Sequence, residues 1–316
     1  MTELIKRTVL SNMEWKLELQ EIVDNSHSPA SRLRFGEPLS KHTYFEIGGP
    51  ATVYYEVGTI EDLIRFAVFK SQQTLPVALL GRGSNFLVSD NGFEGVVIRL
   101  VGDFDQIRYE GHRVRAGGGV SQPKLAKSVA GRGLSGLEFA LGIPGSVGGA
   151  MIMNAGAWGS NFGERVEQVQ VMTDKGEILE LCHDQAGFTY RRSKLDNYFC
   201  VFDISLRLVQ SSPKEVTQLM QKFYQRKIVT QPFVEGSAGC MFKNPPNHSA
   251  GKLIDGCRLK GTRIGDAEVS KTHGNFIINH GNAKAKDVLE LIDLIQNRVK
   301  AEREIDLQME VKLLGF

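Results

Sequence analysis

The uncharged, glycine-rich segment Phe139–Gly163 constrains the fold of this chain more than any other feature. It holds seven glycines and a proline and is poor in leucine and isoleucine, whereas a bilayer helix needs about 20 predominantly apolar residues. A glycine in regular structure costs about 0.5–1 kcal/mol of conformational entropy, so this run is typical of backbone that approaches a bound group closely. A tightly packed glycine corner is the alternative. Glycine is enriched overall, at 34 of 316 residues, against about 7% in average proteins.

The charge balance and the cysteines exclude several classes of protein. Lysine plus arginine exceeds aspartate plus glutamate by 38 − 36 = 2, which gives no electrostatic reason to expect nucleic acid or a membrane surface as a partner. The four cysteines form no CxxC pair, so we expect neither a metal site nor a dithiol redox motif. The N-terminus lacks the pattern of a signal peptide. Free thiols then favour a cytoplasmic protein.

The chain divides into three parts by pattern. Residues 1–35 are expected to form a helical leader, and residues 36–206 a mixed α+β region in two subdomains, 36–100 and 101–206. A second structural unit is expected over residues 207–316.

Four elements of these parts can be predicted from periodicity. Pro76–Leu80 is expected to be a short buried strand, and Leu307–Leu313 alternates apolar and polar residues like a half-buried strand. Ala285–Ile305 has apolar residues at helical spacing. Another helix is expected to begin at Pro213, with one apolar face made of Val216, Leu219, Met220 and Phe223.

The first glycine turn, Gly81–Asn85, follows a predicted buried strand. Turns of this kind expose backbone N–H groups that can bind phosphate oxygens. Phe86 stands where a dinucleotide GxGxxG motif needs its third glycine, and Leu253 after Gly251-Lys252 excludes a Walker A loop. Taken alone, the segment could equally be only a turn.

Three further segments carry residues suited to catalysis. Arg191, in Phe188–Ser193, offers a planar fork for a carboxylate or enolate oxygen, although a solvated strand end is the simpler interpretation. Cys240 lies on a glycine turn and could donate a proton, or only pack as a small hydrophobic residue. Glu310 lies on the polar face of the last predicted strand, where solvation alone could explain it.

Taken together, these segments resemble the UDP-N-acetylenolpyruvoylglucosamine reductase (MurB) family, the flavoenzymes of peptidoglycan precursor synthesis. The matching motifs occur in family order between about residues 40 and 315, and the shorter type II form fits best. The motifs are KHTYFEIGGP, GRGSNFLV, the glycine-rich stretch through Gly159, FTYRRS, GSAGCMFKNP, HGNFIIN and LQMEVKLLG.

The resemblance implies an α+β fold of the vanillyl-alcohol oxidase (PCMH) type. Two subdomains would bind FAD non-covalently, and a C-terminal α/β domain would bind a nucleotide-sugar substrate. NADPH would reduce FAD, and UDP-N-acetylglucosamine enolpyruvate would then be reduced to UDP-N-acetylmuramate. Two other classes remain possible from the residues: an FAD-dependent oxidoreductase of the same superfamily that acts on an alcohol, and a flavin-binding protein without catalysis.

The resemblance also implies roles for individual residues. Arg191 and Glu310 would polarise the substrate carboxylate, and Cys240 would donate the proton, although many family members have serine at this position. An unperturbed thiol titrates near ~8.5, so we expect an alkaline loss of activity that a serine enzyme would not show. FAD would contact Gly81, Arg82, Gly83, Ser84, Asn85, Gly142, Ile143, Pro144, Gly145, Val147, Gly148, Gly149, Asn154, Ala155 and Gly156. Substrate or diphosphate contacts would be Tyr190, Arg226, Lys243 and Asn244.

Overall fold

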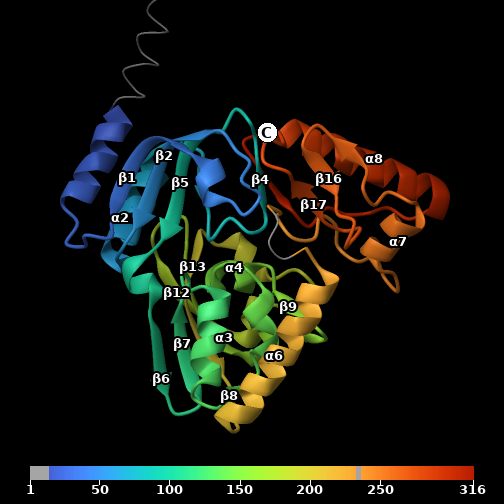
Figure 1. The fold of residues 1–316 in the computed structure, drawn as a ribbon. Helices are drawn as coiled ribbons and strands as arrows, with labels where there is room; N and C mark the ends of the chain where they lie inside the picture. Colours follow the sequence, from blue (N-terminus) through green and yellow to red (C-terminus); the bar gives the residue numbers. More distant parts are fainter. Residues whose placement is uncertain (1–13, 233–235) are drawn as a thin grey trace, which may run out of the picture.

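The computed structural model describes residues 14–232 and 236–316, which form three contacting regions (Figure 1). The first region contains a four-stranded sheet in which β1 is antiparallel to β2 and the other three strands are parallel. Across the sheet its strands are β1 (Arg32–Pro38), β2 (Pro50–Val57), β5 (Phe93–Leu100) and β3 (Val77–Leu79). Strand β3 confirms the strand expected over Pro76–Leu80 to within one residue at each end, but its residues are half-buried and only Leu80, just after it, is buried.

Two helices cover this sheet. Helix α2 (Ile60–Gln72) begins at Thr59, whose side chain accepts a hydrogen bond from the Asp62 N–H. Residues 14–24 are also helical, and Trp15 and Leu19 are buried in the same core. The predicted leader therefore contains a helix, but β1 already begins within its last residues. Residues 1–13 of the leader lie outside the described part of the chain.

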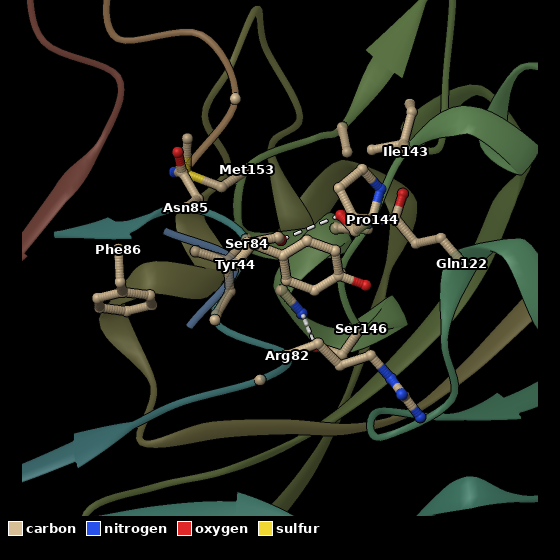
Figure 2. A pocket seen from close by; sticks show the side chains of 18 of the residues that line it. Tyr44, Arg82, Ser84, Asn85, Phe86, Gln122, Ile143, Pro144, Ser146 and Met153 are labelled. Atoms are coloured by element: carbon tan, nitrogen blue, oxygen red, sulfur yellow. Dashed lines mark hydrogen bonds between the residues drawn. The ribbon is translucent and has the colours of Figure 1, made fainter. Parts of the chain in front are cut away.

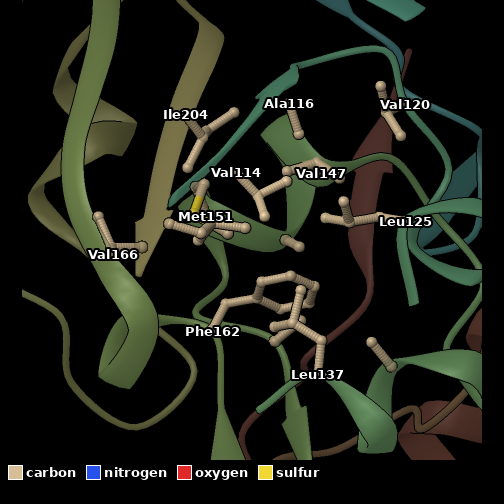
Figure 3. Packing of buried hydrophobic residues seen from close by; sticks show 14 of the residues in the cluster. Val114, Ala116, Val120, Leu125, Leu137, Val147, Met151, Phe162, Val166 and Ile204 are labelled. Carbon is tan, nitrogen blue, oxygen red and sulfur yellow. The ribbon is translucent and has the colours of Figure 1, made fainter. Parts of the chain in front are cut away.

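The second region is built on a five-stranded antiparallel sheet. Helices α3 (Gln122–Ala130) and α4 (Val147–Ile152) pack against it, and Figure 3 shows their apolar side chains meeting those of the sheet. The strands, in order across the sheet, are β12 (Ile178–Cys182), β11 (Val166–Met172), β13 (Cys200–Arg207), β7 (Arg113–Gly117) and β6 (Ile107–Glu110). Smaller elements are α5 (His183–Ala186) and the two-stranded pairs β8 (Leu134–Ser135) with β14 (Val209–Gln210) and β9 (Gly156–Ala157) with β10 (Ser160–Asn161).

Helix α6 (Pro213–Thr230) begins at the expected proline, with Ser212 and Glu215 forming a capping box. Val216 and Met220 are buried in the same core as the five-stranded sheet. The packing therefore joins α6 to the second region, although the sequence grouped it with residues 207–316. Leu219 was expected on the buried face but is 40% exposed. It lies at the edge of the helix face that Val216 and Met220 bury.

The third region surrounds the long helix α8 (Ala285–Arg303), in which Val288, Ile292, Ile295 and Val299 are buried as the helical spacing predicts. Helix α7 (Ala250–Gly256) and a three-stranded antiparallel sheet complete it; the strands are β15 (Arg263–Ile264), β16 (Ala267–Val269) and β17 (Ile277–Asn279). Asp90 of the first region accepts hydrogen bonds from the Ala285 and Lys286 N–H groups at 3.0 and 3.3 Å. It therefore caps α8 from outside the helix.

The end of the chain returns to the first region. Strand β18 (Lys312–Leu314) pairs in parallel with β4 (Phe86–Val88), directly after the Gly81–Asn85 turn (Figure 1). The strand expected over Leu307–Leu313 is thus wrong in extent, because its first residues bond instead to the 241–243 backbone. None of the helices in the described residues is long and apolar enough to cross a membrane.

Candidate active site

A cavity of about 720 Å³ lies where the three regions meet. One wall is the loop 81–85 after β3, and another is formed by residues between Leu141 and Ala157. The third region contributes Cys240 and Glu310. Figure 2 shows part of the cavity, with Ser84 and Pro144 joined by a hydrogen bond. The glycine-rich segment and the first glycine turn, far apart in the sequence, therefore line one cavity.

The loop 81–85 has the geometry of an anion site. Gly83 has a φ of 63°, and a Cβ there would lie 1.9 Å from the His42 carbonyl oxygen, so only glycine fits. Among the described residues, the N–H groups of Arg82, Gly83, Ser84 and Asn85 have no hydrogen-bond acceptor. Buried backbone N–H groups are nearly always paired, and successive free ones form a concavity for an anion. This loop can therefore hold a diphosphate.

The glycines of the longer segment serve two purposes. Gly145, at a φ of 131°, lines the cavity, and a Cβ there would lie 2.9 Å from both Gln122 Nε2 and Ser84 Oγ. A Cβ at Gly148 would lie 2.8 Å from the Val201 carbonyl oxygen, so this glycine lets helix and sheet pack closely. The two interpretations of the segment, a binding surface and a packed corner, therefore each hold for part of it.

Arg191 and Glu310 form an ion pair at the end of the cavity next to the third region. Arg191 Nε lies 3.0 Å from Glu310 Oε1, and another guanidinium nitrogen donates to the Gly156 carbonyl oxygen at 3.0 Å. The Nε–H is buried but is not directed along a hydrogen bond to Glu310. Arg191 also has a φ of 54°, a strained conformation for arginine. Strain of this kind is concentrated at functional sites.

Cys240 lines the same end of the cavity and is held by the third region. Its backbone bridges to Phe276, and the amide of the buried Asn275 bonds both the N–H and the carbonyl of Phe242. Burial, with a further contribution from the Glu310 carboxylate, raises the pKa of the Cys240 thiol to about 12. Arg191 and Lys227 act in the opposite direction. The thiol therefore keeps its proton well above pH 8.5, so the premise of an unperturbed cysteine does not hold.

Glu310 is 14% exposed in its side chain. Burial raises its pKa, and the positive charges of Arg191 and Lys243 only partly offset this. The Glu310 carboxyl therefore holds its proton more readily than a carboxyl in water does. A carboxyl in this state can donate a hydrogen bond to an anionic group that a carboxylate would repel.

The sequence analysis missed Lys227, which lines the cavity between the glycine segment and Cys240. A Cβ on Gly142 would lie 2.6 Å from Lys227 Cδ, which shows how closely the lysine stem covers this glycine. Its ammonium has no hydrogen-bond or ion-pair partner among the described residues. Burial, and after it the Arg191 charge, lowers its pKa to about 8. The sequence did carry a signal for Lys227. Position 227 continues the helix face of Val216 and Met220, so helical spacing could have placed its side chain inward.

Most of the predicted FAD contacts line the cavity, but two do not. Val147 is fully buried in the core of the second region. Asn154 accepts a hydrogen bond from the Gly163 N–H and donates one to the Thr189 carbonyl oxygen. The structure thus places both behind the lining. The lining also includes residues that the sequence did not single out, among them Tyr44, Gln122, Ser146 and Lys312.

The four predicted substrate residues lie outside the lining. Tyr190 is 59% exposed, and Arg226 stacks its guanidinium 4.3 Å from the centre of the Trp158 ring. Asn244 accepts a hydrogen bond from the Ala250 N–H at the start of α7. Lys243 acts on the site only through the effect of its charge on Glu310.

A cavity lined by the glycine loop 81–85 and by Arg191, Cys240 and Glu310 suits a flavin-dependent oxidoreductase. Residues 51–181 match the family described as FAD binding domain, and residues 231–314 match the UDP-N-acetylenolpyruvoylglucosamine reductase C-terminal domain. The chain belongs to the UDP-N-acetylenolpyruvoylglucosamine reductase family. The expected α+β FAD-binding fold with a C-terminal domain and the family resemblance are thereby confirmed.

Individual relatives match over nearly their whole length. The chain is 42% identical to the UDP-N-acetylenolpyruvoylglucosamine reductase 2 of Symbiobacterium thermophilum, over 90% of this chain and 92% of that protein. It is 42% identical to the reductase of Bacillus subtilis, over 88% and 93%. The crystal structure of the reductase from Thermus caldophilus matches with a TM-score of 0.77 at 40% identity, over 90% of this chain and 99% of that one.

Proposed function

We propose that this protein uses NADPH and FAD to reduce UDP-N-acetylglucosamine enolpyruvate to UDP-N-acetylmuramate, a step of peptidoglycan precursor synthesis. One observation carries the proposal: Arg191, Cys240 and Glu310, from three separate motifs, lie at one end of the cavity that begins at the loop 81–85. A flavoenzyme that oxidises an alcohol would not need these three residues together.

The residues present fit FAD. The free N–H groups of the loop 81–85 would hold its diphosphate, and the backbone around Gly145 and Gly156 would lie against it. Bound FAD would accept a hydride from NADPH and pass it to the vinyl group of the enolpyruvyl substrate.

Arg191 and Glu310 would meet the negative charge that develops next to the substrate carboxylate. Arg191 would supply a fixed cation, already oriented by its bond to the Gly156 carbonyl. Because burial raises the pKa of Glu310, this carboxyl takes up a proton more readily than in water, and with that proton it would donate a hydrogen bond to the substrate carboxylate or enolate oxygen. The two residues would thus stabilise the same charge with different donors.

Cys240 would hold the proton that the substrate carbon receives. A proton donor must be protonated when the substrate is bound, and the raised pKa of this thiol satisfies that condition at every physiological pH. The thiol would therefore take the place of the serine hydroxyl found in many family members. A non-catalytic flavin protein would need none of these groups.

The partner implied is a small nucleotide sugar, and we propose that the protein acts in the cytoplasm, where NADPH and the precursor would be present. The test is to purify the full chain, identify the flavin released on denaturation, and assay NADPH oxidation with and without the enolpyruvyl nucleotide. We expect FAD and substrate-dependent oxidation that yields UDP-N-acetylmuramate. Protein that takes up no FAD, or oxidation that the nucleotide does not stimulate, would contradict the proposal.

A further inference from the structure

Gln122 is a buried polar residue that the reaction described above does not use. It is the first residue of α3, it lines the cavity, and it is only 3% exposed. Its side-chain oxygen Oε1 has no hydrogen-bond partner among the described residues. Leaving a buried amide oxygen without a donor destabilises the protein. A group that binds in the cavity would therefore supply the hydrogen-bond donor that Gln122 Oε1 lacks.

The orientation of the Gln122 amide is fixed by its neighbours. Its backbone N–H donates to the Gly145 carbonyl oxygen at 3.0 Å. Its Nε2 is directed at the Pro144 carbonyl oxygen, at 3.5 Å, and turning the amide over would bring two oxygens together there. Figure 2 shows Gln122 beside Pro144, near Ser84. The oxygen, and not the nitrogen, is therefore the free atom of this amide.

The position of Gln122 limits which part of the cofactor it can reach. It adjoins Gly145 and also Ser84 of the loop 81–85, and its own chain neighbour Pro123 also lines the cavity. None of its hydrogen bonds involves the third region, which carries Cys240 and Glu310. Phosphate oxygens offer no hydrogen to an amide oxygen, whereas sugar hydroxyls and the adenine amino group do.

We propose that Gln122 Oε1 binds FAD by accepting a hydrogen bond from a sugar hydroxyl or the adenine amino group next to the diphosphate. This inference rests on FAD binding alone and not on the reaction proposed above. An enzyme inactive toward the enolpyruvyl nucleotide could still confirm it, so the two proposals can fail separately.

The experiment measures the dissociation constants of FAD and FMN for FAD-stripped full-length protein by flavin fluorescence. Gln122→Met and Gln122→Leu remove the acceptor and keep most of the volume. Gln231→Met is the matched control, since Gln231 also lines the cavity but has no buried unpaired side-chain atom. Thermal unfolding of each FAD-free protein reports any loss of packing.

We expect both Gln122 variants to bind FAD about three- to tenfold more weakly, the loss typical of one hydrogen bond, with unchanged FAD-free unfolding temperatures. FMN has the ribityl hydroxyls but not the adenosine half. A loss confined to FAD would therefore assign the donor to the ribose or adenine, and an equal loss for FMN would assign it to the ribityl chain. FAD affinity within twofold of wild type would overturn the proposal. So would an equal loss in Gln231→Met, or a lowered unfolding temperature that accounts for the weaker binding.

Discussion

Arg191 Nε lies 3.0 Å from Glu310 Oε1, which joins the second region to the last residues of the chain across the cavity. The guanidinium opposes the rise in the pKa of Glu310, and the Glu310 carboxylate contributes to the rise in the pKa of Cys240. The pair and the thiol therefore act as one electrostatic unit. Substitutions in it should affect the step in which substrate charge develops.

Arg191→Ala and Glu310→Gln should leave the reduction of FAD by NADPH largely intact and slow the reduction of the enolpyruvyl nucleotide. Losing one oriented electrostatic partner typically costs ~10²–10³-fold in rate. Stopped-flow absorbance of the flavin measures both half-reactions. Arg192→Ala, at the exposed neighbouring arginine outside the cavity lining, is the control and should change neither. An equal loss in both half-reactions would reject this division.

Cys240→Ala should abolish reduction of the enolpyruvyl nucleotide while NADPH still bleaches the flavin. Cys240→Ser should keep substantial activity, because a hydroxyl can replace the thiol as proton donor. With a thiol pKa of about 12, activity should show no loss due to Cys240 between pH 7 and about pH 10, and the serine variant should have the same profile there. A near wild-type rate in Cys240→Ala would mean that the cysteine only packs.

Lys227 should set an alkaline limit on activity. Its lowered pKa of about 8 means that the ammonium is charged below pH 8 and loses its charge above it, so attraction for an anionic substrate weakens. In Lys227→Arg the cation persists to much higher pH, and the falling limb of kcat/KM should move upward. Lys124→Arg, at an exposed lysine on α3, is the control. If the falling limb of kcat/KM stays at the same pH in Lys227→Arg, Lys227 is not the origin of that limb.

Gly83→Ala should lower FAD retention and stability. The new Cβ would collide with the His42 carbonyl oxygen and would also occupy a left-handed conformation. Gly111→Ala is a matched control, since its φ of 62° is nearly the same but nothing lies within 4 Å of its Cβ. The conformational strain of about 1–2 kcal/mol is common to both, so the difference between them measures the collision. Flavin content after purification and urea unfolding give the result, and equal behaviour would refute the steric argument.

Asp90→Ala should destabilise the third region, because it leaves the first N–H groups of α8 without their cap. The loss expected for a helix cap is about 0.5–2 kcal/mol in the free energy of unfolding. Asp174→Ala, which removes an exposed ion-pair partner of Lys70, should change stability less. Urea unfolding measures both variants. Equal effects would mean that the Asp90 contacts contribute nothing beyond a surface charge.

Much of the fold could be predicted from local pattern. Helix α8 followed its apolar spacing, and β3 and α6 began where the sequence indicated. The strand expected before β18 did not form as such, because alternation reports which side chains are buried and not which backbone supplies the hydrogen bonds. Its partner is the distant 241–243 segment, and no local signal carries that information.

The site could be predicted less completely. Arg226 is a predicted substrate contact, but the phase of α6 places it against Trp158 and puts its neighbour Lys227 in the cavity lining. Asn154 was included because its segment lines the cavity, yet its amide holds the turn at Gly163 instead. Electrostatic shifts were also beyond reach, because the charges that act on Cys240 come from Arg191, Lys227 and Glu310, which are far apart in the sequence.

The parallel pairing of β18 with β4 places Lys312 opposite Phe86. Just before that pair, Asn85 Nδ2 donates to the Glu310 carbonyl oxygen at 3.1 Å. The loop 81–85 and Glu310 are therefore positioned relative to one another by one strand register, whose unit is about 3.3 Å per residue. A slip of a single residue would turn Glu310 to the opposite face, and a slip of two would carry it about 6.6 Å along the strand. Three backbone pairs therefore fix the distance between the loop 81–85 and Glu310, and that distance can change only in steps of whole residues.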